Sequence, residues 1–224
     1  MTEVVYNPPD GDPIVVDLRE PGKAALLAWL WPGAGHFYQR RFAKGFLFMI
    51  CILSIFFFGL GLGRGRVVYA SSKADDFRWQ FACQIGIGLP AAPAVLQAVK
   101  TSGGSDPMFV MCERFPPPPN YPADDGGGLA FQRITPENRN GYHGPTLKDG
   151  FMAAPQGPIF SNYRDVLGMW HFDYKHNFDM GTLFTMVAGL LNLLAIYDAF
   201  VGPAIVTKEQ LEITQRKKSN KSDR

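Results

Sequence analysis

The sequence predicts an all-α membrane protein: a polytopic bundle of about four transmembrane helices with a long, irregular, proline-rich extramembrane loop. First, the apolar residues of the 224-residue chain gather into four blocks instead of being spread evenly. Second, residues 46–63 contain no charged residue, and a membrane span needs about 20 apolar residues. Third, a polar stretch rich in proline and glycine, residues 101–179, separates the third block from the fourth.

The chain begins with a polar, proline-bearing segment, residues 1–22. It has neither the basic start nor the apolar core of a secretory signal, so we expect it to remain uncleaved. We expect a mostly flexible tail in which residues 14–16 are the candidate for a short strand. The basic segment at the other end, residues 205–224, is typical of disordered chain.

The first two apolar blocks form a helical hairpin over residues 23–66. Its first arm is short and is interrupted by Pro32 and Gly33, so a kinked span and a re-entrant segment both stay open. The second arm, residues 46–63, is the clearest transmembrane helix in the chain. The bases between the two arms are costly in hydrocarbon and mark a membrane surface.

The rest of the chain supplies two more apolar blocks. A polar loop over residues 67–78 leads to a third span, residues 79–100, which we expect to kink near Pro90. The long loop follows, with a short helix expected near residues 163–170. The fourth span is predicted over residues 180–204.

Charge predicts the orientation of these four spans. With both termini inside, the short inner segments carry twelve bases against three in the outer hairpin. The positive-inside rule therefore favours N-in and C-in, with residues 101–179 outside. The net charge of +2 offers no field that would recruit nucleic acid.

The stretch GAGHFYQRRFAKG resembles the turn of the TM-two domain, a two-helix membrane module. The matching positions are Gly33, Gly35, His36, Phe37, Tyr38 and Gly45. The module usually has an arginine between the histidine and the aromatic pair and a glycine soon after them, whereas this chain continues with Gln39, Arg40 and Arg41. Together with the closing AGLLNLLAIYDA, the layout also resembles an uncharacterised bacterial family of four-helix membrane proteins. The resemblance implies a bacterial inner-membrane location and brings no established reaction.

Two polar residues stand out in the fourth span, Asn192 and Asp198. An acid within a span indicates a buried partner or a function. In the four-span arrangement, Asp198 lies on the same side as Lys23, Arg64 and Arg66, which are its candidate partners, and opposite the Arg40–Arg41 hairpin. The alternative is a proton or ion relay, with Asn192 as a second step.

Few residues suggest catalysis. We expect His36 to donate a hydrogen bond to a turn carbonyl, with a role as ligand or base as the alternative. The residues His171, Asp173, His176 and Asp179 are of types that bind metals, but they meet no established spacing rule. The three cysteines form no zinc or redox motif, and the common hydrolase and phosphate-binding motifs are absent from the sequence.

These observations favour a membrane component that is not an enzyme and acts through lipid or protein partners, without a cofactor or metal. Spacings of four between small residues, such as Gly59 and Gly63, suit helix association with another membrane protein or a second copy. A small transporter or channel subunit is the alternative. A membrane enzyme that uses the loop histidines is a weaker one.

Overall fold

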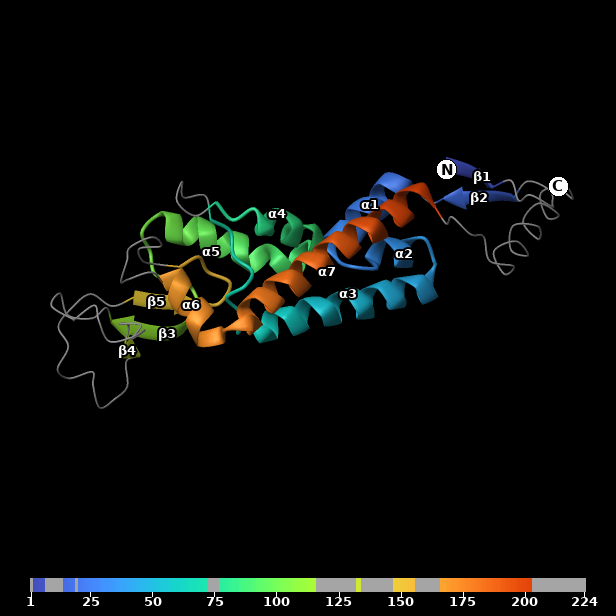
Figure 1. Ribbon diagram of the computed structural model, residues 1–224. Coiled ribbons are helices and arrows are strands. Elements are labelled where there is room, and N and C mark those ends of the chain that lie inside the picture. Colours follow the sequence, from blue (N-terminus) through green and yellow to red (C-terminus); the bar gives the residue numbers. More distant parts are fainter. Residues whose placement is uncertain are drawn as a thin grey trace, which may run out of the picture. The chain divides into compact units, whose positions relative to one another are not determined.

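The computed structural model is mostly helical (Figure 1). The chain divides into two compact units. Unit 1 comprises Met1–Leu53, Gly86–Gly88 and Leu190–Arg224, and unit 2 comprises Ser54–Ile85 and Leu89–Gly189. The structure describes residues 2–6, 14–18, 20–71, 77–115, 132–133, 147–155 and 166–202. The expectations for the middle of the long proline-rich loop and for the C-terminal tail concern residues outside these ranges.

Two helices are long and apolar enough to cross a membrane: α3 (Phe42–Leu62) and α7 (His176–Val201). They correspond to the second and fourth predicted spans. The start of α3 and the end of α7 belong to unit 1, and the end of α3 and the start of α7 belong to unit 2. Within each unit these helix parts pack against each other, so the two helices run antiparallel.

The first apolar block is broken into two short helices, α1 (Pro21–Leu30) and α2 (Ala34–Tyr38). The break comes at Pro32, and Gly33 follows with a left-handed φ of 83°. From there α2 turns back along α1 (Figure 1), where a Cβ atom at Gly35 would lie 2.1 Å from the Ala24 carbonyl oxygen. The first block therefore reverses its direction within unit 1, as a re-entrant segment would, and does not continue as one kinked span.

The third block is also broken, where a single kinked helix was expected. It forms α4 (Gln80–Gln84), two short 3₁₀ turns (Ile85–Ile87 and Leu89–Ala91) and α5 (Ala92–Ser102). Gly88, between the turns, has a left-handed φ of 80°. In unit 2, Gln84 of α4 bonds the Val67 carbonyl, and Gln97 of α5 bonds the carbonyl of Phe151, which lies against Gly65. Both helices therefore return to the segment that follows α3.

Strands occur in two segments that the sequence predicted to be mostly irregular. In the N-terminal segment, β1 (Thr2–Tyr6) pairs antiparallel with β2 (Ile14–Leu18), which includes the candidate strand at residues 14–16 and corrects the expectation of a flexible tail for the paired residues. Part of the long loop forms a three-stranded antiparallel sheet. Its order is β4 (Gln132–Arg133), β3 (Val110–Phe115), β5 (Leu147–Gly150). The short helix expected near residues 163–170 is present as α6 (Val166–Tyr174).

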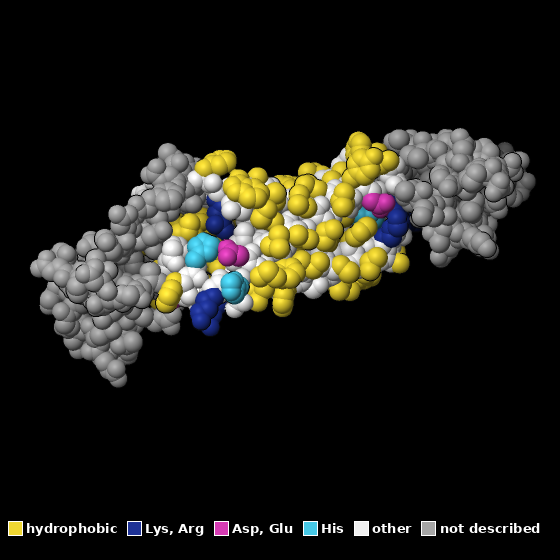
Figure 2. Space-filling model, viewed as in Figure 1, with side chains coloured by type: hydrophobic (Ala, Val, Ile, Leu, Met, Phe, Trp, Pro, Cys, Tyr) yellow, Lys and Arg dark blue, Asp and Glu magenta, His cyan; other side chains and the backbone are white. Residues whose placement is uncertain are grey.

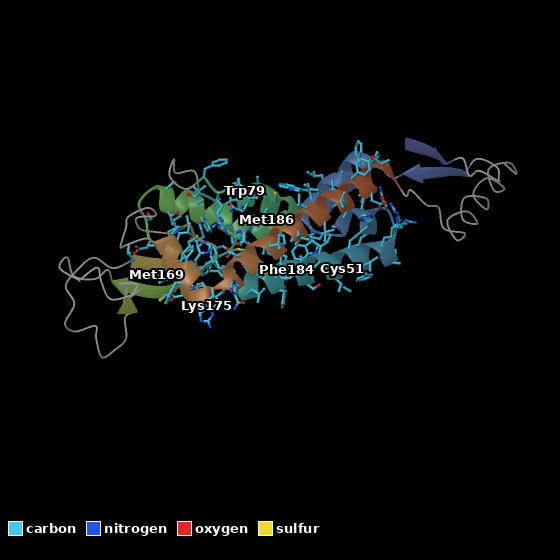
Figure 3. All side chains as sticks on the ribbon, in the orientation of Figure 1. Cys51, Trp79, Met169, Lys175, Phe184 and Met186 are labelled. Atoms are coloured by element: carbon cyan, nitrogen blue, oxygen red, sulfur yellow. The ribbon has the colours of Figure 1, made fainter. Side chains whose placement is uncertain are left out.

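Helix α3 packs closely on α7 in unit 2 through small residues. A Cβ atom at Gly59 would lie 2.8 Å from the Gly181 carbonyl oxygen and 2.8 Å from Cβ of Phe184. Phe184, labelled in Figure 3, packs edge-on against Phe58, with ring centroids 5.3 Å apart. Gly61, two residues further along α3, has open space at the same position.

This difference predicts opposite effects for two alanine substitutions in one helix. Gly59→Ala forces α3 away from α7 and should destabilise the protein by about 1–3 kcal/mol. Gly61→Ala meets no atom and should be neutral or stabilising by up to about 1 kcal/mol, because alanine favours helix. Thermal unfolding of the full chain in detergent measures both. Equal effects of the two substitutions would contradict the close packing at Gly59.

Candidate functional site

The amide side chain of Asn192 joins three parts of unit 1. Asn192 is fully buried on α7, and its Nδ2 donates to the Ala28 carbonyl at 3.1 Å and to the Gly86 carbonyl at 2.9 Å. Ala28 belongs to α1, and Gly86 lies at the break after α4. One side chain thus holds both broken segments against α7.

These two carbonyls are the ones that proline leaves without a helical donor. In a continuous helix, the N–H group four residues later bonds each carbonyl. For Ala28 that residue is Pro32, and for Gly86 it is Pro90, neither of which has an N–H group. Because a carbonyl buried without a donor costs free energy, the two N–H bonds of Asn192 replace the two that are missing.

The two breaks also contact each other in unit 1. A Cβ atom at Gly88 would lie 1.8 Å from the Trp29 carbonyl oxygen. With its left-handed φ, this position therefore accepts only glycine. The predictions from the sequence included neither this contact nor the role of Asn192. The available signal was the recurrence of proline four residues after Ala28 and after Gly86.

Asp198 forms a second polar cluster in unit 1. Its carboxylate accepts hydrogen bonds from His36 Nε2 at 2.9 Å, an Arg41 Nη at 2.9 Å and Lys44 Nζ at 3.4 Å. His36 is fully buried and Arg41 almost so, whereas Lys44 is partly exposed. This carboxylate therefore ties the start of α3 and the end of α2 to the last turns of α7.

The predicted partners of Asp198 were wrong. Lys23 pairs with Glu20, Arg66 bonds Tyr174 in unit 2, and Arg64 lies over the ring of the same tyrosine. The prediction assumed that the first block crosses the membrane completely. This assumption put Arg41 on the side of the membrane opposite Asp198. Because α2 turns back along α1, it brings Arg41 to the end of α7.

His36 does not bond a turn carbonyl through its side chain, as the sequence predicted. Its Nε2 donates to Asp198, since a carboxylate accepts, and its ring packs on Phe48 with centroids 4.8 Å apart. The other residues of the GAGHFY stretch shape the backbone around it. Gly33 and Gly45 lie in close contact, and the ring of Phe37 covers Gly45.

Unit 2 contains a second group of buried polar side chains, whose contacts the sequence did not predict. Arg78 donates to the Tyr69 hydroxyl and the Val67 carbonyl, and its guanidinium lies 4.0 Å from the centre of the Tyr69 ring. Gln84 donates to the same carbonyl and to Thr185 of α7. Arg66 Nε and a carboxylate oxygen of Asp149 form an ion pair at 3.7 Å. These contacts hold the segment after α3 against α7 and the small sheet.

The loop residues with metal-binding side chains are not gathered into a site. His171 Nδ1 lies 3.4 Å from an Asp179 carboxylate oxygen, while Asp173 and His176 are exposed on α6 and at the start of α7. Within the ranges that the structure describes, no group of three or more histidine, cysteine or acidic side chains has a geometry that could hold a metal ion.

The Asn192 contacts predict a large effect of removing the amide. Asn192→Leu leaves two buried carbonyls without donors and should destabilise the protein by about 2–5 kcal/mol. Asn192→Asp keeps the shape but replaces the two donated N–H bonds with an acceptor, so it should be at least as damaging. Thermal unfolding in detergent is the measurement, with Asn177→Leu at an exposed position of α7 as the control. An Asn192→Leu protein as stable as the control would contradict the two hydrogen bonds.

The Asp198 cluster predicts coupling with Arg41. In a double-mutant cycle, Asp198→Asn and Arg41→Gln should show an interaction of about 1–3 kcal/mol in unfolding free energy, because each removes the same buried ion pair. The cycle of Asp198→Asn with Arg66→Gln is the control and should be additive within about 0.5 kcal/mol. Coupling in the control cycle alone would restore the pairing expected from the sequence.

Comparison with known protein families matches residues 23–212 to one described as a family of unknown function, DUF6677. Neither a curated protein nor a solved structure matches the chain. The match includes both broken segments, α3, α7, Asn192 and Asp198. The chain therefore belongs to DUF6677, a family of unknown function.

Proposed function

We propose that this chain is an integral membrane component that is not an enzyme and acts through lipid or protein partners. The observation that carries the proposal is the large apolar surface of its two long helices. Figure 2 shows hydrophobic side chains over the described helices. On α3 the exposed ones include Phe46, Leu47, Ile50, Phe57 and Phe58, and on α7 Leu183, Leu190, Leu193, Leu194 and Phe200.

This surface suits lipid better than water. Soluble monomers rarely expose large contiguous apolar patches. Two polar residues in the apolar part of α7, Thr185 and Asn192, are by contrast fully buried. Apolar side chains outside and hydrogen-bonded polar side chains inside are the pattern that a hydrocarbon environment favours.

The proposed topology has two spans and two re-entrant segments. At 1.5 Å per residue, α3 and α7 measure about 31 Å and 39 Å, enough to cross the ~30 Å core of a bilayer. Residues 21–41 would enter and leave at one membrane face, and residues 78–102 at the other. Non-helical backbone at membrane depth is tolerated where protein covers it, as Asn192 does here.

The distribution of charge supports the N-in, C-in orientation that the sequence predicted. In the two-span topology, however, the turn around Arg41 lies at the inner membrane face. Lys23, Arg40, Arg41 and Lys44 then join the basic C-terminal tail on one side. The positive-inside rule therefore favours N-in and C-in in a bacterial inner membrane, with residues 101–179 outside. The TM-two resemblance of residues 23–66 agrees with a membrane location.

A small transporter or channel subunit is the second candidate. The observation that favours it is the meeting of two proline-broken segments beside Asn192. In secondary transporters, paired broken helices often mark the binding site near the bilayer midplane. The close contact of Gly88 with the Trp29 carbonyl leaves no room for a ligand between those two residues. Reconstituted vesicles that show no ion or solute flux would count against this candidate.

The topology predicts which positions share a membrane face. In a chain whose native cysteines are replaced, single cysteines at Gly22, Ala43 and Ser105 should label with an impermeant maleimide. Gly22→Cys and Ala43→Cys should react from the cytoplasmic side and Ser105→Cys from the outside, because the first segment returns to the face that it entered. Labelling intact cells and inverted vesicles makes the measurement.

Each alternative gives a different labelling result. If residues 23–38 crossed completely, Gly22 and Ala43 would label from opposite sides. If the chain were inverted, all three positions would exchange sides. A chain found in the aqueous fraction after cell lysis, without detergent, would overturn the membrane proposal itself.

A further inference from the structure

Unit 2 buries more positive than negative charge. Among the residues that the structure describes, its buried charged side chains are Arg66, Arg78 and Asp149. Asp149 pairs with Arg66, whereas Arg78, which is 9% exposed, forms no ion pair with a described residue. Asp179 of α7 is 70% exposed and pairs with His171. Because a buried charge without a counter-ion costs free energy, Arg78 is the place in unit 2 to look for a missing anion.

The described neighbours of Arg78 are neutral. Its guanidinium donates hydrogen bonds to the Tyr69 hydroxyl at 3.0 Å, to the Val67 carbonyl at 3.0 Å and to the Thr182 hydroxyl at 3.3 Å. The centres of the Tyr69 and Phe178 rings lie 4.0 Å and 5.6 Å from its Cζ, and the faces of aromatic rings attract cations. These groups hold the guanidinium in place and lower the cost of its burial, but they bring no negative charge.

One N–H group of Arg78 is without an acceptor. Its Nε is buried and forms no hydrogen bond within the described part of the chain. Buried polar groups in native proteins almost always have a partner, and an orphaned one is a sign of a bound water or ion. Because this group belongs to a cation, an anion supplies both the missing acceptor and the missing charge, whereas a water supplies the acceptor alone.

The hydrogen bonds already formed by Arg78 decide which anion fits. A guanidinium holds a carboxylate or a phosphate best through two parallel N–H groups. Each of the two edges that offer such a pair includes Nη2. In Arg78, the two hydrogens of Nη2 are taken by the Val67 carbonyl and the Thr182 hydroxyl. The single N–H group that remains at Nε therefore suits a small spherical anion.

We propose that the Nε–H group of Arg78 binds a halide ion, chloride in the cell, as a counter-ion within unit 2. The ion supplies the acceptor and the negative charge that the described residues around Arg78 lack. This inference goes beyond the proposed function and does not rest on the membrane location, because Arg78 is buried inside unit 2 in water and in a bilayer alike.

The first measurement is thermal unfolding of the full chain in a non-ionic detergent. The salts are sodium bromide, sodium chloride and sodium gluconate at equal concentration, since gluconate is a bulky carboxylate. We expect higher melting temperatures in both halides than in gluconate. Above the dissociation constant, each tenfold rise in halide concentration should lower the unfolding equilibrium constant about tenfold, because one ion is released on unfolding.

Two variants separate a bound ion from a general salt effect. Arg78→Met keeps most of the length of the side chain but removes its charge, so the halide response should disappear. Thr182→Asp places a carboxylate beside Nη2 of Arg78 and supplies a counter-ion from the chain itself. It should melt higher than the natural chain in gluconate and should no longer respond to halide. This variant keeps the proposal testable where Arg78→Met does not fold.

The matched control is Arg64→Met. Arg64 is exposed in the same unit, with its Cζ 5.7 Å from the centre of the Tyr174 ring. Its removal takes the same charge from the surface, so the halide response should stay unchanged. A second control replaces Asp75 and Asp76 with asparagine, because these acids precede Arg78 closely in the sequence. We expect it to keep the response of the natural chain.

Four results would overturn the proposal: equal melting temperatures of the natural chain in halide and gluconate, a halide response that Arg78→Met keeps, equal losses of the response in Arg78→Met and Arg64→Met, and a response that appears only after Asp75 and Asp76 are replaced. The third would indicate diffuse attraction of anions, and the fourth a counter-ion that the chain itself supplies. Fractionation and cysteine labelling test the membrane location separately, so it stands or falls independently of these results.

Discussion

The structure depends on the side-chain amide of Asn192, whose nitrogen has two hydrogens to donate. Prolines at 32 and 90 break the first and third apolar blocks, and each leaves a buried carbonyl without its helical donor. Asn192 Nδ2 donates to both. A hydroxyl has one hydrogen to give and a carboxylate has none, so asparagine or glutamine is required. Both broken segments are thereby held at the same level of α7, where Gly88 permits their backbones to touch.

The element order shows a repeated plan. One broken segment, α1 and α2, comes directly before α3. The second, α4 and α5, comes before the antiparallel helix α7, with the sheet and α6 between them. In the topology proposed above, each broken segment would be a re-entrant segment that accompanies one span. The Asp198 cluster closes unit 1 by joining α7 to the start of α3. Buried polar contacts within each unit thus replace the water that the backbone would otherwise need.

The sequence predicted the helical class and located both long helices, because a long uninterrupted apolar run forms few structures other than a helix. It failed where tertiary contacts decide the result. The chain can reverse at Pro32 only because Asn192, distant in sequence, satisfies the Ala28 carbonyl, and no local pattern reveals that partner. The wrong partners for Asp198 followed from this one error. Strand β3 was missed because its pairing with β5 spans a long separation.

The distance of Asn192 from its partners along the chain has a consequence for synthesis. The Ala28 carbonyl is made 164 residues before the side chain that satisfies it. At about 5–20 residues per second, a ribosome needs on the order of 10–30 s to reach residue 192. During that interval the Ala28 carbonyl lacks the donor that it has in the folded protein. In the proposed membrane location, the burial of the first broken segment would therefore follow the synthesis of α7.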